Sequence, residues 1–192
     1  MPETSEFRIE FAFEVDDAPL EELWGEAATP DNGTGDAAPD GGLAASPPDP
    51  RMTEAIRRIL SDAGLSSCQI SVAIVDDAQI HELNRRYLDH DEPTDVISFP
   101  LAQSEGHLEG QLVVSLDTAR AQAARLGWPV ADELLLYVVH GTLHLAGFDD
   151  RTPDERQQMR QEERRVLGWF NRTPPVDEVA DTGSVGAPAA GE

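Results

Sequence analysis

Apolar and polar positions follow two periods along this chain, and the two periods separate predicted strands from predicted helices. Residues 7–15 alternate between apolar and polar side chains, which is the pattern of a strand buried on one face. Three short apolar segments are also predicted as strands, at residues 68–75, 96–99 and 111–115. Five segments carry helix signals, at residues 52–63, from Asp76 or Asp77 to Tyr87, from Asp117 to near Gly127, from after Pro129 to Gly147, and from Thr152 onward.

The order of these segments predicts the fold class. Strands mixed with helices of about 10–15 residues imply a sheet with helices packed against it. We therefore expect an α+β fold in which a small mixed sheet of about four strands packs with about five helices. The strand at 96–99 is expected to stop at Pro100, and a loop is expected over residues 101–109. Thr152 as N-cap and Pro153 at the first helical position begin the last helix.

Composition divides the chain into a core and three flanking parts. Residues 1–25 hold the first strand and its exit, and residues 51–172 form the predicted catalytic, metal-binding core. Between them, residues 26–50 are mostly Ala, Gly, Pro, Asp and Ser, which predicts a flexible acidic insertion. We interpret this insertion as a spacer, with a partner-binding arm as the alternative. Residues 173–192 are predicted to be a disordered acidic tail.

The chain is strongly acidic, with a formal net charge of −23. Nucleic-acid-binding proteins usually present a basic face, so this charge weighs against tight non-specific binding of RNA. Most of the excess lies outside the core: residues 1–50 hold 13 acidic residues and one arginine, whereas residues 51–172 hold 20 acidic residues and 13 arginines. The chain has no lysine, and arginine is the better side chain for bidentate phosphate contacts. The predicted core therefore remains compatible with a nucleic-acid substrate.

Cysteine content and hydropathy indicate where the protein works. The single cysteine, Cys68, excludes an intramolecular disulfide framework and suits a reducing compartment. We expect Cys68 to be a small buried residue beside Ile70 and Val72. No segment is apolar over the length of a membrane span, and the acidic N-terminus lacks the apolar centre of a signal peptide. A cytoplasmic protein without a membrane partner is therefore expected.

His140 and His144 are the most informative chemical feature of the sequence. Four residues apart on one helix, they lie about 40° apart around its axis, so both imidazoles can bind one ion. Gly147 is predicted to end this helix in a left-handed conformation, and the turn can bring Asp150, or its neighbour Asp149, back toward the histidines. Three ligands and an open position are typical of a catalytic metal site. A surface pair, or two hydrogen-bonded core histidines, is the alternative.

Three blocks of sequence resemble the YbeY family of metal-dependent rRNA maturation endonucleases. In the family signature His-Gly-x-Leu-His-Leu-x-Gly-aromatic-Asp-His, residues 140–149 match every fixed position up to the last histidine. A second block at residues 84–100, with Asn84 and Tyr87 followed by Pro-Thr-Asp-Val-Ile-Ser-Phe-Pro, is similar to the family's other recognisable stretch. A third block at residues 159–168 fits its closing helix. The resemblance covers roughly residues 51–170, and residues 7–15 correspond to the family's first strand.

The sequence departs from the family at three positions. Asp150 stands where the family has its third histidine, Leu88 where it has an active-site arginine, and Gln111 where it has an acidic residue. A carboxylate binds zinc at about the same distance as an imidazole, so Asp150 preserves a third ligand. It also adds negative charge, which makes harder ions such as manganese better competitors. Arg85 or Arg86 could occupy the space of the absent arginine.

The resemblance implies a function and a set of site residues. It implies a single-strand-specific endoribonuclease that acts on the 3′ end of small-subunit rRNA and in ribosome quality control. Its partners would be rRNA and the small ribosomal subunit. Zinc is the expected cofactor, one ion per chain, with manganese or nickel as alternatives. The residues concerned are His140, His144 and Asp150, as metal ligands and catalytic residues. Three further assignments come from the residues themselves, each with an alternative. Asp149 orients a histidine or is a solvated turn residue. Ser98 with Thr94 and Asp95 lies at the pocket floor or caps the strand end and the turn. Arg85 and Arg86 are phosphate contacts or solvated helix residues.

Two other functions compete with this hypothesis. A zinc peptidase would carry His-Glu-x-x-His, in which the glutamate is the general base, but Gly141 occupies that place here. A non-catalytic ribosome-associated protein could retain the metal for stability alone. Leu88 and Gln111 favour this second alternative, because the loss of an active-site arginine could mean the loss of turnover.

Overall fold

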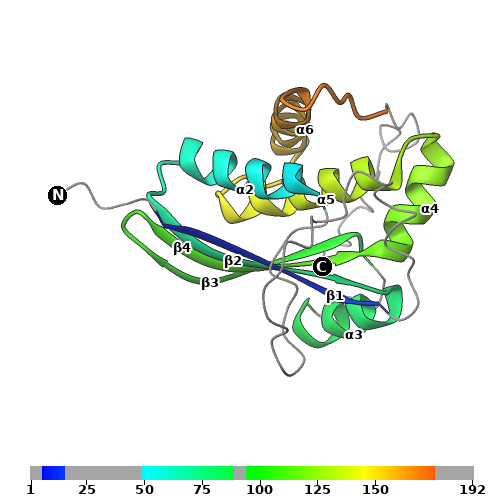
Figure 1. Cartoon of the computed structure of the whole chain (residues 1–192), viewed down its shortest axis with the longest axis horizontal. Coiled ribbons are helices and arrows are strands. Elements are labelled where there is room, and N and C mark those ends of the chain that lie inside the picture. Colours follow the sequence, from blue (N-terminus) through cyan, green and yellow to red (C-terminus); the bar gives the residue numbers. More distant parts are fainter. Residues whose placement is uncertain (1–5, 16–48, 89–93, 176–192) are drawn as a thin grey trace, which may run out of the picture.

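The computed structural model describes residues 6–15, 49–88 and 94–175 (Figure 1). The N-terminal strand and the predicted core fall within these ranges, apart from residues 89–93. Nearly all of the predicted insertion at 26–50, and the predicted tail beyond residue 175, lie outside the described residues.

The described elements form a four-stranded mixed sheet with five helices, which confirms the predicted fold class. The strands are β1 (Phe7–Glu14), β2 (Ser67–Val75), β3 (Val96–Ser104) and β4 (His107–Ser115). The helices are α2 (Pro50–Asp62), α3 (Asp77–Leu88), α4 (Leu116–Leu126), α5 (Val130–Leu145) and α6 (Pro153–Gly168). The strand order is β1-β2-β4-β3, in which β2 runs parallel to both of its neighbours and β3 runs antiparallel to β4.

The two faces of the sheet carry cores of different size. Because side chains alternate along a strand, Val72 and Ile74 of β2 point to one face, whereas Ala73 and Val75 point to the other. The first face belongs to the large core, which α2 and α5 cover, and α6 packs on α5 above them (Figure 1). The second face forms a small core with Ile80 of α3. In Figure 1, helix α3 lies beneath the sheet, on the side opposite to α2 and α5. Helix α5 is therefore held between the sheet and α6.

The predicted loop over residues 101–109 is wrong, because β3 continues past Pro100 to Ser104 and β4 begins at His107. β3 is an edge strand, where a proline that cannot donate a hydrogen bond is tolerated. The register also shifts between Pro100 and Ala102, so Leu101 is left out of the pairing as a bulge. Side chains 100–104 are all exposed, so this part of the strand has no apolar alternation by which it could be recognised.

The start of α6 has the predicted N-cap. The hydroxyl of Thr152 accepts a hydrogen bond from the backbone N–H of Glu155, and the Glu155 carboxylate accepts one from the backbone N–H of Thr152. Pro153 occupies the first helical position, as predicted. This capping box fixes where α6 leaves the turn that follows α5, and thereby which residues of α6 face α5.

Replacement of Thr152 by alanine should lower the free energy of unfolding by about 1 kcal/mol, because an N-cap hydroxyl is lost. Urea denaturation followed by circular dichroism would measure the change. Thr173→Ala is the matched control, since Thr173 is exposed and lies after the last helix. An unchanged unfolding midpoint in Thr152→Ala would contradict the assigned role of the cap.

Cys68 is buried in the large core, as expected, and burial raises the pKa of its thiol to about 11. At neutral pH the residue is therefore an uncharged apolar side chain. None of the described helices has the length and apolar character needed to cross a membrane.

Candidate metal centre

The end of α5 is built to return the chain toward its own last turns. Gly147 has a φ of 97°, the predicted left-handed conformation, and its N–H donates to the carbonyl of His144 at 3.0 Å. The N–H of Phe148 donates to the carbonyl of Leu143 at 3.0 Å. These two bonds form a Schellman motif, the common way in which a glycine ends a helix. The turn carries Asp150 back beside α5.

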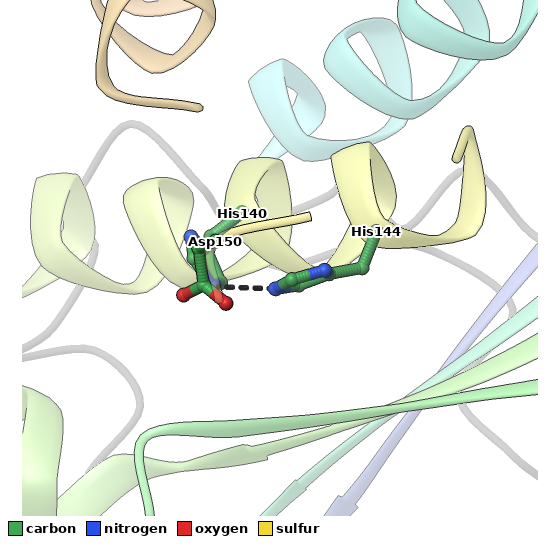
Figure 2. Close-up of side chains that lie close together, drawn as sticks. All are labelled: His140, His144 and Asp150. Carbon is green, nitrogen blue, oxygen red and sulfur yellow. Dashed lines mark hydrogen bonds and ion pairs between the residues drawn. The ribbon is translucent and has the colours of Figure 1, made fainter. Parts of the chain in front are cut away.

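His140, His144 and Asp150 meet at one point. Their possible ligand atoms all lie within 4.8 Å of one another. The two Nε2 atoms are 3.0 Å apart, and Oδ2 of Asp150 is 3.9 Å from Nε2 of His140. Figure 2 shows the two imidazoles pointing toward each other from α5, with Asp150 beside His140. Ligands about 2.0–2.1 Å from one tetrahedral ion lie about 3.3 Å apart, so the observed spacing fits a single metal ion.

The other nitrogen of each imidazole is hydrogen-bonded, which determines where the protons lie. Nδ1 of His144 is 3.0 Å from the carbonyl oxygen of Phe148, and Nδ1 of His140 is 2.6 Å from Oε1 of Glu163. A carbonyl oxygen and an ionised carboxylate can only accept a hydrogen bond. Both Nδ1 atoms must therefore carry the proton. In the neutral histidines both Nε2 lone pairs then face each other across 3.0 Å. A cation between them would relieve this repulsion, so the donor set fits a metal ion.

The electrostatic potential where His140, His144 and Asp150 meet is negative. Burial alone would lower the pKa of His140, but the hydrogen bond and charge of Glu163, with the charges of Asp95 and Asp150, raise it above its usual value. The same carboxylates that stabilise a protonated His140 would stabilise a metal cation in the place of that proton. The electrostatics of the site therefore favour a cation.

Ser98 joins β3 to α5 beside this group, and Asp95 caps the start of β3. The hydroxyl of Ser98 donates to the carbonyl of Gly141 at 3.1 Å, which ties β3 to α5 beside His140. Oδ1 of Asp95 accepts from the backbone N–H of Val96 at 2.9 Å and from the hydroxyl of Thr94 at 3.0 Å. Both residues were predicted at the pocket floor; the contact of Ser98 is with α5, whereas those of Asp95 are with its own neighbours in the chain.

Asp149 does not make the contact that was expected of it. Its Oδ1 accepts from the backbone N–H of Asp150 at 2.8 Å, and its Oδ2 lies 3.1 Å from Nε of Arg151. The carboxylate that accepts a hydrogen bond from a histidine is instead that of Glu163, a residue that the sequence indicated only as part of the closing helix. A signal was available: Met159 and Val166 are two of the three buried residues of α6, and Glu163 lies four residues after the first and three before the second, on the same side of the helix.

Arg85 and Arg86 lie away from the histidines. They belong to α3, on the opposite face of the sheet from α5 (Figure 1). Arg85 pairs with Glu82, and the Arg86 guanidinium lies 5.4 Å from the centre of the Tyr87 ring. An arginine that does approach the metal group is Arg156 of α6. Its Nη1 donates to the carbonyl of Asp150 at 3.1 Å and to that of the next residue at 2.8 Å.

The fold and this group define a class of protein, an α+β domain with a histidine–histidine–aspartate group that could hold one metal ion. The sequence model of the family described as Endoribonuclease YbeY matches residues 48–171. The chain therefore belongs to the YbeY family, as its motifs indicated.

Three proteins that carry the family name are similar to this chain. The chain is 42% identical over 135 residues to Endoribonuclease YbeY of Rhodopirellula baltica, which covers 68% of this chain and 70% of that protein. It is 42% identical over 130 residues to the Pelotomaculum thermopropionicum protein of the same name, covering 64% and 86%. It is 41% identical over 116 residues to that of Aquifex aeolicus, covering 59% and 77%. A Thermotoga maritima protein with a known solution structure is 21% identical, with a TM-score of 0.47 over 95% of this chain and 99% of that one.

Proposed function

We propose that this protein is a metal-dependent endoribonuclease that cuts single-stranded RNA during rRNA maturation, at the 3′ end of the small-subunit rRNA, and in ribosome quality control. Membership of the Endoribonuclease YbeY family supports the reaction class. The observation that carries the proposal is the convergence of His140, His144 and Asp150 on one point. The proposed partners are rRNA and the small ribosomal subunit, and the proposed location is the cytoplasm.

His140, His144 and Asp150 are the proposed metal ligands. A divalent cation held there would supply charge that stabilises a phosphodiester undergoing attack and would make a water molecule more acidic. The histidines present their Nε2 atoms, because Glu163 and the carbonyl of Phe148 hold the protons on Nδ1. Zinc is the proposed ion, with manganese or nickel as alternatives, since Asp150 replaces a family histidine with a harder oxygen ligand.

Another arginine lies close to the proposed ligand Asp150, although Leu88 replaces the family arginine and Arg85 and Arg86 belong to α3, on the other face of the sheet. Arg156 uses one nitrogen of its guanidinium to bind the carbonyl of Asp150. The side chain is exposed, so its other N–H groups are open to a phosphate. We propose Arg156 as the phosphate contact next to the metal. An arginine in this place weakens the alternative of a non-catalytic protein, because that alternative relied on the loss of the family arginine.

The space at position 141 argues against the zinc peptidase. A Cβ atom at Gly141 would lie 2.9 Å from Cδ2 of Leu112, 3.0 Å from Oγ of Ser98 and 3.0 Å from Cγ2 of Val96. The glutamate of a His-Glu-x-x-His motif would therefore have to enter a filled space between α5 and the sheet. The geometry that holds the histidines leaves no room for that general base.

The test is cleavage of a single-stranded RNA that spans the 3′ end of the small-subunit rRNA, with the same RNA annealed to its complement as control. We expect the zinc-loaded protein to cut the single strand and to leave the duplex intact. Chelation should stop cleavage, and added zinc should restore it. A folded, metal-loaded protein that cuts neither RNA would contradict autonomous nuclease activity and would favour the ribosome-associated binding protein.

A further inference from the structure

We infer that Glu163 is a positioning residue of the metal centre: it orients His140 through Nδ1 and adds a second negative charge behind the ligands. The inference rests on the proposed metal site. It adds a residue from α6 to a site whose proposed ligands all come from α5 and the turn after it.

The contact is short and largely shielded from solvent. Oε1 of Glu163 lies 2.6 Å from Nδ1 of His140, and the Glu163 side chain is only 13% exposed. A carboxylate in such a position is costly unless it is hydrogen-bonded, and Nδ1 of His140 is its hydrogen-bond partner among the described residues. The arrangement is the one in which a carboxylate fixes the ring and the tautomer of a ligating histidine.

The two histidines are held by acceptors of different charge. Glu163 offers an anionic oxygen to His140, whereas His144 donates to the neutral backbone carbonyl of Phe148. A charged acceptor makes an imidazole a stronger base, and thus a better metal ligand. His140 should therefore be the stronger of the two histidine donors. With Asp150, Glu163 brings two negative charges to the site, enough to balance a divalent cation.

Glu163 and its neighbour Glu162 make different contacts, although both lie on α6. Glu162 pairs with Arg165 at 2.7 Å, with 27% of its side chain exposed, and makes no described contact with either histidine. Glu163 shares the inward face with Met159 and Val166, which are packed in the large core. Glu162 therefore offers a matched control for the loss of a carboxylate from the same turn of α6.

The experiment compares Glu163→Gln, Glu163→Ala and Glu162→Gln with the unchanged protein, all as full-length chains. Zinc affinity would be measured by competition with a chromophoric chelator. Long-range nitrogen–proton correlation spectra of the metal-free proteins would report the tautomer of His140. Urea denaturation would confirm that each variant is folded. Glutamine can still accept the Nδ1 proton without carrying charge, so it separates orientation from electrostatics.

We expect Glu163→Ala to weaken zinc binding by about 10–100-fold and to leave His140 as a mixture of tautomers. Glu163→Gln should keep the Nδ1–H tautomer but should weaken zinc binding by about 10-fold through lost charge. Glu162→Gln should match the unchanged protein. Wild-type zinc affinity and wild-type tautomer in a folded Glu163→Ala variant would overturn the inference. Neither measurement uses RNA, so the inference can hold even where the unchanged protein fails to cut RNA.

Discussion

Replacement of Asp150 by alanine is expected to reduce zinc affinity and RNA cleavage by more than about 100-fold. Loss of a group that merely orients a ligand costs about 10–100-fold, and the loss of one of three ligands should cost more. The Asp150 side chain is 43% exposed, so its removal should leave the fold intact. Zinc competition and single-turnover cleavage of the single-stranded RNA would measure the two effects.

Two companion variants define what the result means. Asp149→Ala removes the neighbouring carboxylate, which caps the backbone N–H of Asp150 instead of facing the histidines, so its effect should be under about 10-fold. Asp150→His installs the histidine of the family signature and should restore zinc binding and cleavage. If Asp150→Ala binds zinc as tightly as the unchanged protein, Asp150 is not a ligand.

Replacement of Gly141 by alanine is expected to destabilise the protein by about 1–3 kcal/mol, the usual cost of overpacking a core. A loss of stability is unusual for this substitution, because alanine in place of a helical glycine normally stabilises a protein by about 1 kcal/mol. Here α5 lies so close to β3 and β4 that the added methyl group would meet three side chains at 3.0 Å or less. Cleavage should also fall, since α5 would have to move away from Ser98 and would carry His140 with it.

Gly168→Ala is the control, because a Cβ at this last residue of α6 meets nothing within 4 Å. Its free energy of unfolding should be unchanged or slightly higher. Urea denaturation monitored by circular dichroism would compare both variants with the unchanged protein. A Gly141→Ala variant as stable as Gly168→Ala would show that the gap between α5 and the sheet is wider than the structure has it.

Most of the fold could be predicted because local signals and burial agree along the chain. The alternation at residues 7–15, the proline and threonine that begin α6, and the glycine that ends α5 each fix an element by its own chemistry. The outer half of β3 could not be predicted in this way. Its residues are exposed, it includes Pro100, and its pairing depends on the hairpin partner β4, which no local pattern encodes.

The candidate site divides in the same way. His140 and His144 share one helix, and the turn at Gly147 is a local motif, so their approach to Asp150 could be predicted from spacing. Glu163 comes from another helix, and its contact depends on how α6 packs on α5. The position of Arg85 and Arg86 could not be predicted for a related reason: their helix α3 lies on the opposite face of the sheet from α5, which the sequence around them does not specify.

The measurement that tests the central claim most directly is a titration of zinc into metal-free protein, with RNA cleavage followed at each step. A single site at His140, His144 and Asp150 predicts that the cleavage rate rises in proportion to added zinc and levels off at one equivalent per chain. The Asp150→Ala variant should stay inactive throughout the same range. Full cleavage by the metal-free protein, or a rate that does not respond to zinc, manganese or nickel, would contradict the account.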